Sequence, residues 1–294
     1  MSTAASSADA RPLRSDIEEG DTSRVGFSGQ IRRAARIAVI LLWTGVLTSC
    51  MAVAWLPSWF LGKRGVRWRA RVRRPFFRFW ARGALRILGV RITTDGPPPP
   101  LGSLIVSNHL SYLDIVVLAS VVSTVFVSKA EVRNWPFWGP IATMGGTIYI
   151  DRSRKRDTVR TLSDMGAAFE RGDSVVVFPE ATSTAGDTII PFKSSLLATA
   201  AAKGNLVHWM TVTYATPNGA RSARDAVCWW GDMQFLEHFL GLCALPRVDG
   251  HVSFGDTPIR STDRKRLALE LRDSMLQRFR PVTPSDEPND APTP

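Results

Sequence analysis

Cysteine is scarce in this chain, with three residues in a total of 294. Cys50, Cys228 and Cys243 lie far apart and show no metal-ligand spacing, which excludes a disulfide framework and a cysteine-based zinc site. A hydrophobic content of 45% excludes a disordered chain. A mean hydropathy of -0.02 excludes a protein with many membrane spans. The length suits one large domain or two modest ones.

Acidic residues are nearly absent from one segment. The whole chain has 37 Lys and Arg against 26 Asp and Glu, a balance typical of proteins that bind nucleic acid or an anionic membrane. Residues 29–95 hold fourteen Lys and Arg and a single acid, Asp95, whereas residues 96–294 hold twenty of each sign. The positive charge therefore belongs to one segment, and the larger part of the chain is electroneutral.

Charge is missing altogether from residues 37–62. This apolar run reaches the length of about 20 residues that crosses a bilayer core. Trp43 and Trp59 suit membrane interfaces, and Pro57 is expected to end or kink the helix. A cleaved signal peptide fits poorly, because the run starts late, is too long and lacks a small-residue cleavage site. We expect a membrane-inserted helix, either spanning or re-entrant, with the following domain on the cytoplasmic side of the cell (inner) membrane.

A basic amphipathic helix is expected after the apolar run. Arg78, Arg82 and Arg86 recur every four residues and share one helical face, while apolar residues cover much of the rest. This pattern predicts an interfacial helix bound to an anionic phospholipid membrane. The alternatives are a hairpin of a soluble protein with a solvated basic face, and a nucleic-acid site. The apolar run disfavours nucleic acid, so we expect no such partner.

The rest of the chain reads as one α/β domain between two tails. Residues 1–28 and 281–294 are expected to be disordered, residues 29–94 to form the membrane helix and the basic helix, and residues 95–280 to form the domain. Apolar runs and helical periodicities alternate, which indicates a mostly parallel central sheet with flanking helices. The expected strands are 104–107, 125–128, 147–150, 174–178, 207–214, 226–230 and 251–254. The expected helices include 157–171, 194–203 and 267–279.

Histidine is also rare, with four residues, and two of them have an Asp five positions later. His251 and Asp256 fall in an extended run, where they lie about 16 Å apart and cannot cooperate. His109 instead follows a buried strand and precedes a helical run, so Asp114 can reach back to its ring. Active sites of α/β proteins lie at such strand ends, which favours His109 as a base oriented by Asp114. His208 and His238 are expected to be structural.

Four blocks of sequence carry a resemblance to a known family. Residues 108–114 (NHLSYLD), 146–152 (GTIYIDR) and 178–183 (FPEATS) resemble three ordered motifs of the glycerolipid/lysophospholipid acyltransferases, the group that includes 1-acyl-glycerol-3-phosphate acyltransferase. A weaker fourth block lies in 207–214. The similarity covers roughly residues 75–280. It implies an acyltransferase-type α/β domain preceded by an N-terminal membrane-inserted segment.

The resemblance also implies a reaction. His109 takes the proton from a lysolipid hydroxyl, and the oxygen attacks the thioester of acyl-CoA or acyl carrier protein, while Asp114 fixes the imidazole tautomer. These donors are substrates, so no cofactor and no metal are expected. The remaining site residues implied for acceptor binding are Asn108, Lys129, Arg152, Glu180, Ala181 and Thr182. For Lys129 the alternative is a solvated loop charge, and part of the cluster around Arg152 is expected to be only a solvated face.

Two departures from the family pattern bear on the acceptor. Ala181 replaces a glycine, which predicts a backbone φ below zero at this position. Ser183 stands where members that recognise phosphate have Arg, and family members that acylate lyso-ornithine lipid have a small polar residue there. The expected acceptor is 1-acyl-glycerol-3-phosphate, with lyso-ornithine lipid or another lysolipid as the alternative. A second alternative is a non-enzymatic membrane adaptor with the same fold.

Overall fold

Seven strands form one sheet in a computed structural model that describes residues 26–136, 138–151 and 154–282. Most of both expected tails, and Arg152, lie outside the described residues. The strand order is β1-β7-β6-β2-β5-β3-β4, and every neighbouring pair is parallel except β6 and β7. The strands are β1 (Val90–Asp95), β2 (Leu104–Ser107), β3 (Thr124–Lys129), β4 (Ile148–Ile150), β5 (Ser174–Val177), β6 (Val207–Ala215) and β7 (Val248–Phe254).

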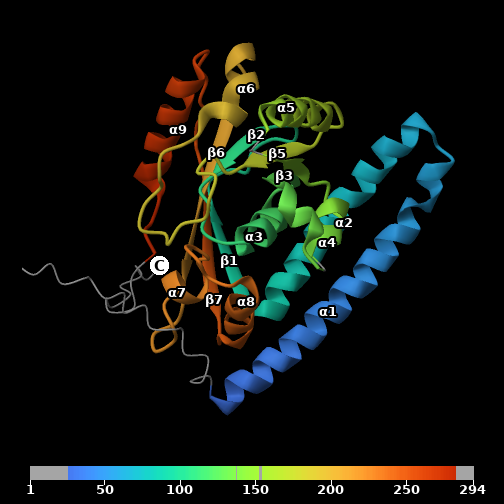
Figure 1. Ribbon diagram of the computed structural model, residues 1–294. Coiled ribbons are helices and arrows are strands. Elements are labelled where there is room, and N and C mark those ends of the chain that lie inside the picture. The colour runs from blue at the N-terminus through green and yellow to red at the C-terminus, as the bar shows by residue number, and fades with distance from the viewer. Residues whose placement is uncertain (1–25, 137, 152–153, 283–294) are drawn as a thin grey trace, which may run out of the picture.

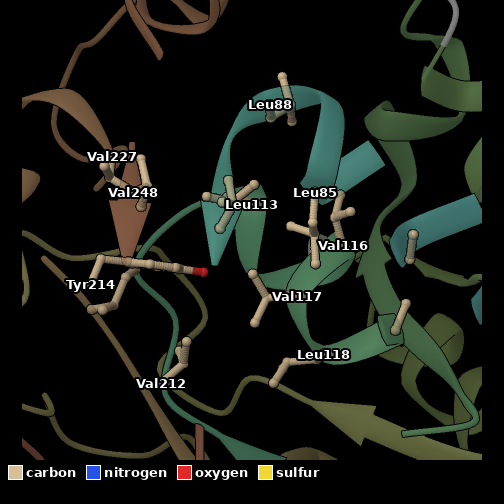
Figure 2. Close-up of a cluster of buried hydrophobic side chains, with 14 of the residues drawn as sticks. Leu85, Leu88, Leu113, Val116, Val117, Leu118, Val212, Tyr214, Val227 and Val248 are labelled. Carbon is tan, nitrogen blue, oxygen red and sulfur yellow. The ribbon is translucent and has the colours of Figure 1, made fainter. Parts of the chain in front are cut away.

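Helices cover both faces of this sheet (Figure 1). One face packs against α1 (Phe27–Trp55), α2 (Lys63–Leu88), α3 (Leu113–Val121) and α8 (Phe235–Ala244), and Figure 2 shows part of this cluster. The other face packs against α5 (Lys155–Glu170), α6 (Ala198–Lys203) and α9 (Arg264–Arg278). Alternation along β2 explains the two layers, because Ile105 points to the first face and Leu104 and Val106 to the second. The remaining helical segments are η2 (Leu56–Trp59), η3 (Ala130–Asn134), α4 (Trp138–Met144), η4 (Ser194–Leu197) and α7 (Ala223–Ala226).

The expected α/β architecture with a mostly parallel sheet is confirmed, but one expected strand is wrong. Residues 226–230 end the short helix α7 and continue as a loop. Ser222 caps that helix by accepting a hydrogen bond from the Asp225 amide, and the Trp229 amide donates to the Leu110 carbonyl instead of to a strand. The strand β1 was not expected, because the residues just before the proline-rich junction carry no long apolar run.

Helices α1 and α2 form an antiparallel hairpin that packs against the domain (Figure 1). Helix α1 ends at Trp55, and Pro57 lies in the short η2 turn that follows, as expected. Helix α2 is longer than the sequence suggested, since it begins at Lys63 and continues through Pro75. Two residues beyond the expected domain end, Val282 is buried, and its amide donates to the Gly186 carbonyl.

The arginine row of α2 faces the protein more than was expected. Arg78 donates to the carbonyls of Ser120 and Val121, and Arg82 also donates to Ser120, at distances of 3.0 to 3.1 Å. The last carbonyls of a helix lack partners within the helix and attract cations, which is why α3 ends against this row. Arg78 is half-buried against the domain, whereas Arg82 and Arg86 are exposed, so contact between this row and phospholipid stays a prediction.

Candidate active site

The site lies at the carboxyl ends of two central strands. His109 follows β2, and Glu180 follows β5, its parallel neighbour. Carboxyl ends of adjacent parallel strands meet at one edge of the sheet, so the first and third sequence blocks come together there. The Thr184 amide donates to the His109 carbonyl at 3.0 Å, which joins the two loops directly.

The predicted contact between His109 and Asp114 is present. The ring Nδ1 of His109 lies 2.8 Å from Oδ2 of Asp114. Helix α3 begins only at Leu113, so Asp114 lies in its first turn, and the same oxygen accepts the amides of Leu110 at 2.7 Å and Ser111 at 3.0 Å. The carboxylate thus binds the unpaired amides ahead of the helix and the histidine ring together.

The open nitrogen of His109 points away from this carboxylate. Because Nδ1 faces a carboxylate oxygen, it carries the proton in the neutral ring, and Nε2 carries the lone pair. Nε2 accepts no hydrogen bond from any residue that the structure describes. The side chain is 23% exposed, and its ring stacks on Phe178 with centroids 4.2 Å apart. The arrangement can therefore accept a proton at Nε2 from a bound molecule.

The second oxygen of Asp114 has a partner that the sequence analysis missed. The hydroxyl of Tyr214, on β6, donates to Oδ1 at 2.7 Å. Burial, and next the charge of Asp114, raise the pKa of Tyr214 well above its usual value. The two residues are 100 positions apart, so no local spacing could indicate this contact.

Glu180 is buried and holds the backbone on both sides of the site through hydrogen bonds. It is 2% exposed, its Oε1 accepts the His109 amide at 2.8 Å, and its Oε2 accepts the Ile190 amide at 3.2 Å. Burial raises the pKa of Glu180 to about 7, although the two amide bonds oppose the shift. The structure thus places this carboxyl in the protein interior, whereas the sequence suggested that it contacts the acceptor.

Asn108 is also buried and is occupied by the backbone. Its side-chain amide donates to the Val212 carbonyl at 2.9 Å and accepts the Val212 amide at 2.8 Å. These two bonds fasten the end of β2 to β6. Asn108 therefore fixes the position of the next residue, His109, from the interior of the protein.

The backbone prediction for Ala181 is wrong. Its φ is +67°, and it is the one non-glycine residue with a positive φ in the described part of the chain. The loop turns here in a left-handed conformation that glycine adopts without strain, which accounts for the glycine of the family motif. Thr182 is exposed, and its hydroxyl lies 3.4 Å from the Ser183 carbonyl. The Ser183 hydroxyl donates to the Trp229 carbonyl.

Of the two predicted cations, the structure locates one. Lys129 is the last residue of β3, the strand next to β5, so it lies at the same edge of the sheet as Glu180. It is exposed and forms no ion pair with any described residue. Arg152 follows β4 and lies outside the described residues.

An aromatic cavity of about 100 Å³ lies two ring contacts from the histidine, which is not among its wall residues. Phe178 connects the two, since it stacks on His109 and also lies parallel to Phe126 in the cavity wall, 6.3 Å away. Further wall residues include Trp80 of α2, Trp138 of α4 and Phe235 of α8, together with Tyr112 and Trp135 from loops. No pattern along the chain predicted this cavity, although the tryptophans at 135 and 138 were a signal. A larger hollow of about 480 Å³ lies between α5 and α6, lined by residues at the amino ends of β2 and β6, away from the histidine.

The other histidines have structural partners or surroundings. His238 lies 2.9 Å from the Tyr112 hydroxyl and 3.0 Å from the Cys228 carbonyl, and burial lowers its pKa to about 4. His251 contacts Thr93 and lies 3.6 Å from Asp95, whereas Asp256 pairs with Arg278, so the two residues have different partners, as expected.

Metal ligands do not gather near the site in the described residues. Within residues 26–136, 138–151 and 154–282 no group of three or more His, Cys, Asp or Glu side chains could hold a metal ion. The expectation that neither a metal nor a cofactor takes part stays a prediction.

Comparison with known proteins agrees with this geometry. A family model described as Acyltransferase matches residues 91–214. The chain is 34% identical to a lyso-ornithine lipid O-acyltransferase of Brucella abortus, over 69% of this chain and 80% of that protein. It is 33% identical to a 1-acyl-sn-glycerol-3-phosphate acyltransferase of Neisseria meningitidis, over 70% and 79%. The crystal structure of the acyltransferase PlsC from Thermotoga maritima shares the fold, with a TM-score of 0.52, 16% identity, and coverage of 81% and 95%.

Proposed function

The chain belongs to the acyltransferase family, and from that premise we propose that it moves a fatty acyl group from a thioester donor to the hydroxyl of a lysolipid, with His109 as the base. One observation carries the proposal. The Nδ1 of His109 is held by a fully buried carboxylate, while its Nε2 accepts no hydrogen bond from any described residue and the side chain is partly exposed. Acyl transfer to an alcohol needs this pairing, because a hydroxyl must lose its proton as it attacks.

The reaction balances with the residues of the site and two substrates. Nε2 of His109 takes the proton of the lysolipid hydroxyl, the hydroxyl oxygen forms an ester bond with the thioester carbonyl carbon, and the carbon–sulfur bond breaks. The sulfur leaves as a thiolate and takes the proton back from the imidazolium. Asp114 stabilises the imidazolium in between and keeps Nδ1 protonated. We propose acyl-CoA or acyl carrier protein as the donor, with no covalent enzyme intermediate and no cofactor.

The aromatic cavity suits the acyl chain. Its walls are almost wholly apolar, and the rings of Phe126 and Phe178 link one wall to the histidine. A chain methylene buried there gains about 0.8 kcal/mol relative to water. We propose that this cavity holds part of the acyl chain of the donor.

The position of Ser183 bears on the acceptor. Its hydroxyl is committed to the Trp229 carbonyl, so this position supplies no cation for a phosphate. We therefore place lyso-ornithine lipid first among the acceptors, in the reverse of the order that the motif blocks suggested. The Brucella and Neisseria relatives match about equally well and do not rank the two. Lysophosphatidate (1-acyl-glycerol-3-phosphate) remains the second candidate, because Lys129 offers a cation at the same edge of the sheet that pairs with no acid of the described residues.

The helical hairpin of α1 and α2 suits insertion into a membrane from one of its two sides. Residues 27–59 are long and apolar enough to cross a membrane by length and composition. However, α2 runs back beside α1, and its exposed Arg64, Arg67 and Arg71 would each cost about 2.5 to 3.5 kcal/mol at the bilayer centre. We propose that the pair enters one leaflet of the inner membrane from the cytoplasmic side, with the exposed Trp59 and Phe60 at its tip.

A panel of acceptors and donors tests the proposed function. The full chain in phospholipid vesicles is given labelled acyl-CoA or acyl carrier protein together with lyso-ornithine lipid, lysophosphatidate or other lysolipids. We expect transfer to lyso-ornithine lipid to exceed transfer to lysophosphatidate, and Ser183→Arg to move the ratio toward lysophosphatidate. Absence of turnover with every pair would contradict the proposal and favour the adaptor. A preference for lysophosphatidate in the unaltered chain would contradict only the assignment of the acceptor.

A further inference from the structure

Asp114 holds a buried negative charge that hydrogen bonds stabilise. Its side chain is 0% exposed, and no Lys or Arg of the described residues forms an ion pair with it. A buried carboxylate without a cation depends on donors for its stability. Oδ2 has three, from the His109 ring and the amides of Leu110 and Ser111, whereas Oδ1 has one in the described part of the chain, the hydroxyl of Tyr214.

We propose that Tyr214 is a positioning residue for acyl transfer. Its hydroxyl holds Oδ1, fixes the plane of the Asp114 carboxylate, and so sets both the orientation of the His109 ring and the pH range over which that ring acts as a base. The inference rests on the proposed function, because it takes His109 as the base of the reaction. Nothing in the sequence blocks assigns this role to Tyr214.

Three observations distinguish Tyr214 from an aromatic residue that only fills the core. Its hydroxyl is 2.7 Å from Oδ1, and a carboxylate can only accept, so the hydroxyl is the donor. Burial and the charge of Asp114 raise the pKa of Tyr214, so the hydroxyl keeps its proton at working pH. Figure 2 shows the ring extending from its strand with the oxygen directed toward the start of the helix that carries Leu113.

The strand that carries Tyr214 is itself held in register with the histidine. Asn108, the neighbour of His109, makes two hydrogen bonds to Val212, two positions before Tyr214 on β6. Residues two apart on a strand point to the same face. The end of β2 and the hydroxyl of Tyr214 are therefore fixed relative to one another, and the carboxylate lies between them.

Tyr214→Phe removes a single hydroxyl and keeps the ring. Asp114 then keeps its charge with one donor fewer and holds the imidazolium proton more strongly. We expect kcat to fall about tenfold, as for other partners that orient a reacting group, with the KM of the acyl donor unchanged. We also expect the acid limb of the kcat/KM profile to move to higher pH. A residue that only supports the fold would lower the amount of active protein and leave the acid limb in place.

Tyr149→Phe is the matched control. Tyr149 is also buried, and its hydroxyl bonds Thr143 and the Gly139 carbonyl, away from the carboxylate. The control loses a similar hydrogen bond and should leave the acid limb where it is. Equal profiles for the unaltered chain and Tyr214→Phe would overturn the proposal, and so would equal shifts in both variants.

A second measurement works even where Tyr214→Phe folds poorly. The chain has three tyrosines, so 3-fluorotyrosine labelling yields three fluorine resonances, which Tyr112→Phe and Tyr149→Phe assign by elimination. We expect the Tyr214 resonance to titrate as the His109–Asp114 pair changes protonation, to keep that titration in Glu180→Gln, which removes the neighbouring carboxyl, and to lose it in His109→Ala. A resonance that does not move with pH would overturn the role of Tyr214. Because this readout needs no turnover, it is independent of the acceptor panel that tests the proposed function.

Discussion

The buried carboxyl of Glu180 makes a measurable prediction about stability. Burial raises its pKa from 4.5 to about 7 in the folded chain, and the unfolded chain keeps the ordinary value. Between these values the folded state holds the proton and the unfolded state does not, so unfolding releases it. The stabilisation is complete below pH 4.5 and is lost as the pH rises through about 7.

The size of the effect follows from the shift. Since each unit of pKa difference is worth about 1.36 kcal/mol, the free energy of unfolding should fall by about 2.5 kcal/mol between pH 5 and pH 8 because of this group. Glu180→Gln cannot ionise and should remove that part of the slope. It also leaves one of the amides of His109 and Ile190 without an acceptor, which lowers stability by about 1–3 kcal/mol at every pH. The lost hydrogen bond lowers the free energy of unfolding equally at every pH, so it can be separated from the change in the pH dependence.

The assay is denaturant unfolding in detergent at a series of pH values, with Glu170→Gln as the matched control. Glu170 is an exposed residue at the end of α5, and its replacement should leave the slope of the unaltered chain intact. The reasoning is refuted if Glu180→Gln keeps the same slope as the unaltered chain, because the carboxyl would then titrate alike in both states.

Three further variants, two with a single substitution and one with two, have expected outcomes. Ala181→Gly removes the strain of a left-handed φ, which costs about 1 kcal/mol for alanine. Glycine also has more conformational freedom in the unfolded chain, which offsets part of this gain, so denaturant unfolding should show an increase in stability of up to about 1 kcal/mol. A net loss of stability would contradict the presence of strain at this position. Asp173→Asn leaves the buried Arg73 and the neighbouring Arg74 without their anion and should cost about 3–5 kcal/mol by the same method; a change below about 1 kcal/mol would show that this cluster does not anchor α2. Replacing Trp59 and Phe60 together by Ala should weaken sedimentation with anionic vesicles at least tenfold, since these side chains are 72% and 89% exposed. Replacing the exposed Leu101 and Leu206, which precede β2 and β6, is the control, and an equal loss of vesicle binding there would argue against the hairpin as the membrane contact.

The sequence predicted those features that depend on neighbours along the chain. The strands β2 and β5 are short runs of buried apolar residues, and α5 shows helical periodicity, so local pattern was enough. The contact of His109 with Asp114 spans five positions and follows from the helix start between them. These parts of the fold and of the site could be predicted from the sequence alone.

The features that were missed depend on partners far along the chain. The hydroxyl of Tyr214 reaches Asp114 across 100 positions, and Arg78 binds the end of α3 across 42. The residues that line the aromatic cavity come from α2, α3, α4 and α8 among others, so only packing brings them together. The positive φ of Ala181 lies in a loop whose neighbouring residues are both held from afar, Glu180 by the His109 amide and Ser183 by the Trp229 carbonyl.

The central claim is that Nε2 of His109 takes the proton of a lysolipid hydroxyl. The most direct test is acyl transfer from a labelled thioester donor to lyso-ornithine lipid or lysophosphatidate by His109→Ala, compared with the unaltered chain in the same vesicles. His208→Ala is the control, since His208 is half-buried on β6 at the opposite end of the sheet. The account predicts a loss of at least a hundredfold in kcat for His109→Ala, the low end of the contribution of a general base, and near-normal transfer by the control. Full transfer by correctly folded His109→Ala would contradict it.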